Sequence, residues 1–170
     1  ASGLAAAIAA AEDGTSVVVL ERAPECGRTI LATGNGRCNF SNAQLAWERY
    51  NDPGFVEAVC GPGFGQDVLA FFEECGLAWA EEEGGRLYPL SRQAASVREA
   101  VLSRAGRSGA TLAPAREVTG IERDEKIWRV TYDGAGPGSV TSRSVVLAMG
   151  GGEELIHALG LASSPFEPVL

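Results

Sequence analysis

Hydrophobic and polar residues alternate along this chain with two different periods, and the order of these periods predicts an α/β fold. The alanine-rich stretch from Gly3 to Asp13 has the composition of a helix, and Gly14 follows it where helices commonly end. The apolar, β-branched run from Ser16 to Leu20 then predicts a strand that ends at Glu21. A helix and a strand in this order are typical of the second half of a dinucleotide-binding βαβ unit.

The sequence starts at Ala1, directly before this helix, so we expect a unit that lacks its first strand and its first two glycines. In a complete unit the helix N-terminus binds a pyrophosphate through its amide groups and its dipole. Here Ser2 and Gly3 would take that place. Glu21, at the carboxyl end of the second strand, would bind the ribose hydroxyls, with Arg22 beside it.

The middle of the chain is predicted to contain short helices, a hairpin and a longer helix. Turn residues and amphipathic spacing place the short helices over Ala43–Tyr50, Gly54–Cys60 and Asp67–Cys75. The hairpin joins Leu77–Glu82 to Arg86–Leu90 through Gly84 and Gly85. The longer helix covers Ser91–Arg107.

Most charged residues of this region are expected to be solvated, and its aromatic residues to be buried. The solvated residues would be the acidic run Glu81–Glu83 at a strand end and the helix residues Arg92, Arg98 and Arg104. The buried ones would be Phe71, Phe72 and Trp79. Tyr88 is predicted to pack on its strand, and a role as a proton donor is the weaker alternative.

The last third of the chain reads as strands followed by a short helix. We expect a parallel strand at Thr111–Leu112 and a final strand at Ser144–Ala148. Between them, three alternating segments separated by turns predict a β-meander over Arg116–Arg123, Lys126–Asp133 and Ser139–Arg143. The helix would cover Glu153–Leu159 and carry His157, the single histidine, for which a surface or helix-terminal role is favoured.

Composition and charge narrow the classes of function. With 170 residues, 45% of them hydrophobic, the chain can form one domain with its own core. The formal net charge of -8 argues against nonspecific binding to nucleic acid or to an anionic membrane. The apolar helix near the start lacks the features of a targeting segment. The oligomeric state has no readable signal.

The four cysteines are not arranged as a metal site or as a dithiol redox centre. Cys26, Cys38, Cys60 and Cys75 form no CxxC pair, and no cluster of histidines accompanies them. We expect reduced thiols, a cytoplasmic location and no metal.

The stretch from Gly27 to Asn42, GRTILATGNGRCNFSN, is the clearest candidate for a ligand-binding loop. Its glycines can adopt positive φ angles or allow a ligand to approach the main chain. Arg28 and Arg37 are natural partners for phosphate or carboxylate groups. Taken alone, the loop could equally be a surface turn rich in Gly and Asn.

Three segments together resemble one family of bacterial flavoproteins, the HI0933-like or aminoacetone-oxidase-like family, one member of which reduces a bile-acid double bond. The segments are GRTILATGNGRCNFSN from Gly27 to Asn42, GGRLYPLSRQAASV from Gly84 to Val97, and VVLAMGG from Val145 to Gly151, and they follow ASGLAAAIAAA and VVVLERA at the start of the chain. The match departs from the family pattern at Thr29, where a lysine is usual, and at Met149, where a threonine is usual.

The resemblance implies a Rossmann-like FAD-binding domain of the glutathione-reductase type with a β-meander, incomplete at both ends over residues 1–170. It implies that Val118 contacts the adenine and that Gly150 and Gly151 close over the cofactor. The pyrophosphate-to-flavin region would be lined by Gly34, Asn35, Gly36, Arg37, Cys38 and Asn39. Cys38 is favoured as a packing or flavin-contact residue rather than a catalytic one. An inserted substrate domain would begin near residues 165–170.

The activity that the resemblance implies is flavin-mediated hydride transfer from NADH or NADPH to an unsaturated or carbonyl-bearing small molecule. No residue can be named as catalytic. A non-catalytic flavin-binding or dinucleotide-binding module and an inactive truncated product remain as alternatives. A flavoenzyme of the fumarate-reductase-like or tRNA-modifying type is disfavoured, because TGNGRCN is not its signature. Because the first strand is missing, we expect residues 1–170 alone to bind FAD weakly or not at all.

Overall fold

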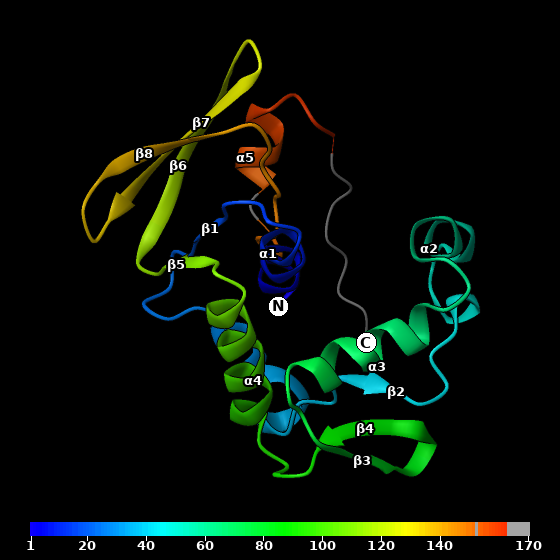
Figure 1. Ribbon diagram of the computed structural model, residues 1–170. Coiled ribbons are helices and arrows are strands. Elements are labelled where there is room, and N and C mark those ends of the chain that lie inside the picture. Colours follow the sequence, from blue (N-terminus) through cyan, green and yellow to red (C-terminus); the bar gives the residue numbers. More distant parts are fainter. Residues whose placement is uncertain (152, 163–170) are drawn as a thin grey trace.

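A computed structural model describes residues 1–151 and 153–162, and its centre is a Rossmann-like arrangement of parallel strands and helices. Strand β1 (Val18–Leu20) pairs in parallel with β5 (Thr111–Ala113). Helices α1 (Ser2–Glu12) and α4 (Ala94–Arg107) contact each other beside this pair (Figure 1). The predicted α/β fold and the parallel pairing of these strands are confirmed.

A second sheet lies on the other side of α4 and has the strand order β2-β4-β3. It contains β2 (Ser41–Asn42), β3 (Trp79–Glu82) and β4 (Arg86–Pro89), all antiparallel to their neighbours. The predicted hairpin is confirmed, and its turn residues Gly84 and Gly85 both have a φ of 74°. Helices α2 (Pro53–Cys60) and α3 (Phe64–Glu74) connect β2 to this hairpin.

The third sheet is the predicted β-meander, and it projects from the opposite end of the molecule (Figure 1). It contains β6 (Arg116–Asp124), β7 (Ile127–Gly134) and β8 (Gly138–Ser142). A register shift between Val118 and Gly120 interrupts the pairing of β6 with β7. Helix α5 (Glu153–Ala158) follows, close to its predicted position.

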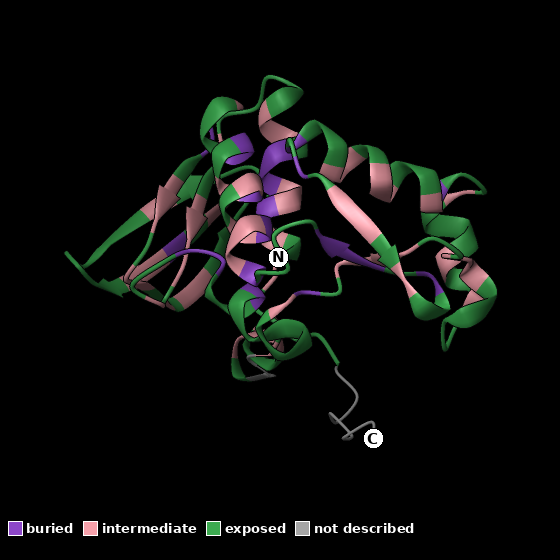
Figure 2. Cartoon of the chain, turned by 90° about the horizontal axis from the view of Figure 1, so that it is seen from below, coloured by how far each residue is buried: buried purple, intermediate pink, exposed green. Residues whose placement is uncertain are grey.

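The core follows one face of α4, because apolar residues recur on that helix every three or four positions. Towards its C-terminal half, Val101 and Ala105 pack against Leu4 and Ile8 of α1. Towards its N-terminal half, the second buried cluster contains Ala94 and Val97 of α4 together with Ile30, Cys38 and Leu77. Figure 2 shows these buried positions gathered in the middle of the molecule. The second cluster therefore fixes the Gly27–Asn42 segment to α4.

Two predicted elements are wrong. Only Trp47–Arg49 is helical, as a short 3-10 turn, within the predicted helix Ala43–Tyr50. The Ala43 amide instead donates to the Gly85 carbonyl, which extends the pairing of β2 with the hairpin into the predicted helix. The predicted strand Ser144–Ala148 pairs with no strand in the described part of the chain, and an extended segment needs such a partner to form a ladder.

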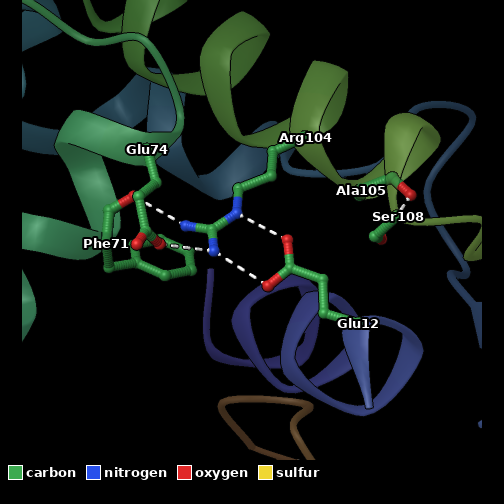
Figure 3. A network of polar contacts seen from close by, with 6 residues as sticks. All are labelled: Glu12, Phe71, Glu74, Arg104, Ala105 and Ser108. Atoms are coloured by element: carbon green, nitrogen blue, oxygen red, sulfur yellow. Dashed lines mark hydrogen bonds and ion pairs between the residues drawn. The ribbon is translucent and has the colours of Figure 1, made fainter. Parts of the chain in front are cut away.

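Four charged residues that we expected to be solvated form defined contacts: Glu82, Arg92, Arg98 and Arg104. Arg104 is 9% exposed and joins α4 to Glu12 of α1 and to Glu74 of α3 (Figure 3). Arg98 donates from Nε to the Cys26 carbonyl at 2.9 Å. Glu82 binds two arginines, as described below. Each of these contacts joins residues from different elements, which helical or strand periodicity does not encode.

Two further points bear on the predicted domain organisation. The predicted start of an inserted domain near residues 165–170 lies outside the described residues. Within residues 1–151 and 153–162, none of the helices combines the length and the apolar character needed to cross a lipid bilayer.

Candidate functional site

The backbone of the TGNGRCN loop contains three consecutive left-handed residues, Gly34 to Gly36, and a fourth at Cys38. The φ angles are 54° at Gly34, 54° at Asn35, 81° at Gly36 and 57° at Cys38. Left-handed conformations cost energy for residues with a Cβ, so Asn35 and Cys38 mark a strained loop that its surroundings hold in place. The Cys38 amide donates to the Thr33 carbonyl at 3.1 Å, which closes the loop on itself.

Gly34 permits the closest approach within this loop. A Cβ added at Gly34 would lie 2.9 Å from the Asn39 backbone nitrogen and 3.8 Å from Cε1 of Tyr88. Backbone atoms cannot move aside cheaply, so alanine does not fit here in either space or conformation. Gly36 differs, because a Cβ at that position would meet open space.

The loop has a buried face and an exposed face. The side chains of Ile30 and Cys38 are 5% exposed and pack in the cluster on α4. Residues Gly34 to Gly36 and Asn39 are exposed. The Cys38 thiol therefore packs in the core, and its residue can meet a ligand at the exposed face only through its backbone.

Arg37 connects the loop to the neighbouring hairpin. Its Nη2 donates to both carboxylate oxygens of Glu82, at 2.6 and 2.7 Å. Its guanidinium also lies 4.2 Å from the centre of the Tyr88 ring, within cation–π range. Glu82 accepts a second ion pair from Arg92, at 2.5 Å. The hydrogen bond from Arg37 is the main cause that lowers the pKa of the Glu82 carboxyl below its ordinary value.

Backbone contacts reinforce this connection. The Phe40 amide donates to the Leu87 carbonyl at 3.1 Å, and Nδ2 of Asn42 donates to the Gly84 carbonyl at 2.9 Å. A Cβ at Gly85 would lie 2.7 Å from Oδ1 of Asn42. The segments GRTILATGNGRCNFSN and GGRLYPLSRQAASV, which are far apart in sequence, thus form one structural unit.

The first turn of α1 is where three glycine-bearing segments meet. A Cβ at Gly3 would lie 3.2 Å from Cβ of Ala148, just before Gly150 and Gly151. A Cβ at Gly27, where the loop begins, would lie 3.3 Å from Cδ1 of Leu4. No side chain caps this helix at Ala1. The first amide groups of a helix favour anions, so the arrangement suits a phosphate-bearing ligand.

Glu21 lies where β1, β5 and β6 meet. Its amide donates to the Ala113 carbonyl at 3.1 Å, and its carbonyl accepts from the Arg116 amide at 2.8 Å. Its carboxylate accepts from the Ala23 amide at 2.8 Å through Oε1, so one of its two oxygens already has a local partner. The same junction places Glu21 beside the start of β6, the strand that carries Val118. Ser2, Arg22 and Arg28 are exposed.

Two surface hollows are lined by residues outside the predicted site, apart from Asn42 at the edge of one of them. In the described ranges, no group of three or more His, Cys, Asp or Glu residues could bind a metal ion.

A family model described as the HI0933-like protein Rossmann domain matches residues 1–160. This chain belongs to the HI0933-like family. A 3-dehydro-bile acid delta(4,6)-reductase of Clostridium scindens is 36% identical to it, over 100% of this chain and 44% of that protein. A ribosomal RNA dihydrouridine synthase of Haemophilus influenzae is 29% identical, over 98% of this chain and 41% of that protein. The HI0933-like chain thus spans less than half the length of these relatives, one of which is named as a reductase.

The comparison with solved structures supports the fold alone. The crystal structure of Thermovibrio ammonificans THI4 superimposes with a TM-score of 0.54 and 17% identity, over 82% of this chain and 50% of that one. At this level of identity, the likeness extends to the Rossmann-like arrangement and to nothing finer.

Sequence reasoning missed Glu82, whereas the predicted packing of Tyr88 on its strand is confirmed by its exposure of 8%. Both lie on the same face of the hairpin, because Glu82 pairs with Arg86 and Ala80 pairs with Tyr88 across the strands. The alternation of side chains in the predicted hairpin could have placed them together. It could not have shown that Arg37, 45 residues from Glu82 in sequence, would lie between them.

Proposed function

We propose that this chain is the cofactor-binding part of an FAD-dependent oxidoreductase. The observation that carries the proposal is that the first turn of α1, which has no side-chain cap, lies against Gly27, where the segment with the strained TGNGRCN loop begins, and against Ala148, just before Gly150 and Gly151. The family match and the reductase among the relatives support it. Anionic phosphates suit this arrangement despite the negative net charge, because oriented amide groups rather than net charge would bind them.

We assign the described residues to the parts of FAD as follows. The amide groups of Ser2 and Gly3 would bind the pyrophosphate. The free carboxylate oxygen of Glu21 would accept from the ribose hydroxyls, with Arg22 nearby and Val118 at the adenine. The flavin side would meet Arg28, Gly34, Asn35, Gly36, Arg37, Asn39, Gly150, Gly151 and the backbone of Cys38.

When bound, FAD supplies hydride transfer between NADH or NADPH and an unsaturated or carbonyl-bearing small molecule. The protein residues contribute position and electrostatics. The guanidinium of Arg37 would stabilise negative charge close to the loop, since charge-assisted hydrogen bonds are strong where water is excluded. The exposed glycines would leave room for the cofactor to approach the main chain.

Reduction of a uracil base in RNA is a second candidate, favoured by the similarity to the ribosomal RNA dihydrouridine synthase. The net charge of -8 weighs against it, because RNA binding depends on clustered basic residues. We therefore propose a small-molecule substrate, no nucleic-acid partner and no membrane partner. The four unpaired cysteines support a reducing, cytoplasmic setting.

The test uses the whole protein that contains this chain, purified and scanned for absorbance before and after anaerobic addition of NADH or NADPH. We expect flavin bands that bleach on addition of one of the two. Flavin bands that neither nicotinamide bleaches would favour the non-catalytic module. A colourless protein that takes up no added FAD would refute the proposal.

A substrate comparison separates the two candidate activities. The reduced protein is mixed with an unsaturated steroid ketone in one sample and with unmodified ribosomal RNA in another. Reoxidation by the steroid alone supports the small-molecule proposal. Dihydrouridine detected in the RNA by mass spectrometry would favour the second candidate.

The same proposal covers the isolated residues 1–170, which we expect to bind FAD weakly or not at all. The reason is that the segment Ser144–Ala148, which lies beside Gly3 of α1, pairs with no strand in the described part of the chain. The glycine-bearing segments at the proposed pyrophosphate site therefore lack the support of a sheet. Retention of one FAD per purified chain would contradict this.

A further inference from the structure

The Glu82 carboxylate, close to the TGNGRCN loop, forms ion pairs with two arginines. Its carboxylate binds Arg37 of the loop through both oxygens and Arg92 through Oε1. The Glu82 side chain is 23% exposed, whereas that of Arg92 is 61% exposed. A carboxylate with two cationic partners and little exposure is a fixed part of the structure rather than a solvated strand end.

The contact leaves Arg37 able to bind a ligand. Both oxygens of Glu82 accept from the same nitrogen, Nη2. In the part of the chain that the structure describes, Nε and Nη1 of Arg37 have no hydrogen-bond acceptor. Glu82, Arg37 and Arg92 together carry one excess positive charge, so the group still attracts an anion.

Tyr88 completes the support of the guanidinium. Tyr88 is 8% exposed, so its ring is packed within the hairpin region. With the ring on one face and the carboxylate at Nη2, the long Arg37 side chain is restricted to one arrangement. A free arginine would lose its rotamer freedom on binding a ligand, and a side chain that is already fixed avoids that loss.

We propose that Glu82 is a positioning residue that holds Arg37 in a binding-ready orientation at the FAD site. Glu82 acts through Arg37 and does not touch the cofactor. Arg92 assists by anchoring Oε1 of the carboxylate. This inference rests on the proposed function, and it adds a residue outside the two glycine-rich segments to the site.

The test measures the dissociation constant for FAD in the whole protein by quenching of flavin fluorescence. Four variants are compared with the wild type: Glu82→Gln, Arg37→Met, the double variant, and Glu81→Gln as the control. Glu81 is exposed and points to the opposite face of the same strand. Its substitution therefore removes the same negative charge without removing the contact to Arg37. The midpoint of unfolding without FAD is measured for every variant. If Glu82→Gln does not fold, Glu82→Asp replaces it, since it keeps the charge and shortens the reach.

We expect Glu82→Gln to weaken FAD binding by about three- to tenfold and Glu81→Gln to leave it unchanged. In the Arg37→Met background, the further change at Glu82 should have no effect, because its partner is gone. A purely structural role would weaken binding equally in both backgrounds and would overturn the inference. Unchanged or tighter binding by Glu82→Gln would also overturn it. Failure of the wild type itself to bind FAD would refute the proposed function, and this inference with it.

Discussion

Replacing Arg104 by methionine removes one buried charge and keeps most of the aliphatic stem. Its Nε and Nη2 each donate to a carboxylate oxygen of Glu12 at 2.9 Å, and Nη2 also pairs with Glu74 at 2.6 Å. Its Nη1 donates to the Phe71 carbonyl at 2.9 Å. The side chain thus joins α4 to both α1 and α3 (Figure 3).

The size of the loss follows from what remains after the substitution. Breaking a fully buried ion pair costs about 3–5 kcal/mol, because the remaining charge stays buried. Here Glu12 and Glu74 are 43% and 62% exposed, so both carboxylates regain water. The Phe71 carbonyl keeps its hydrogen bond from the Cys75 amide at 3.1 Å. We therefore expect a loss of only about 1–2 kcal/mol, or a fall of roughly 3–6 °C in Tm.

The assay is urea-induced unfolding of the apo protein, followed by far-UV circular dichroism. Arg107→Met is the matched control, because Arg107 is exposed on the same helix and donates only to Ser103 Oγ. It should change the free energy of unfolding by less than about 0.5 kcal/mol. Fully buried pairs lose about 3 kcal/mol or more, and a loss of that size for Arg104→Met would refute the reasoning about the exposed carboxylates. A loss no larger than that of the control would refute it as well.

Two further predictions concern titration and thiol reactivity. The hydrogen bond from Arg104 lowers the pKa of Glu12 below the ordinary value of 4.5, so this ion pair stabilises the fold above that pH and the contribution is lost as pH falls through the lowered pKa. In the acid range, the free energy of unfolding should therefore depend less on pH for Glu12→Gln than for the wild type. The same pH dependence in both proteins would contradict the pairing. Burial raises the pKa of the Cys26 and Cys75 thiols, whereas Cys60 is exposed. Iodoacetamide should therefore modify Cys60 first, as mapped by mass spectrometry of the products. Equal rates of modification at these three cysteines would contradict the described burial.

Elements with local signals were predictable from the sequence. The meander, the hairpin and the longest helix follow from alternation, turn residues and helical spacing, all of which operate over a few residues. The positive φ angles at Gly34 and Gly36 were foreseeable for the same reason, since glycine adopts them readily.

Contacts between distant residues were not predictable. Arg104 and Glu12 are 92 positions apart, and nothing in the spacing of either helix marks them as partners. Arg37 and Glu82 belong to different segments, and only the folded hairpin brings them together. The strand predicted at Ser144–Ala148 is wrong for the same reason, since its formation also depends on a distant partner. An apolar run becomes a strand only when a neighbouring strand pairs with it.

The central claim, that the TGNGRCN loop belongs to an FAD site, is tested most directly by titrating FAD into the whole protein as wild type and as Gly34→Ala. Alanine at this position requires a φ of 54° and places its Cβ 2.9 Å from the Asn39 nitrogen, so the loop must shift. We predict one bound FAD per wild-type chain and binding weaker by about tenfold or more in the variant, with the unfolding curve of the core retained. Equal FAD affinity in the two proteins, or no binding by either, would contradict the account.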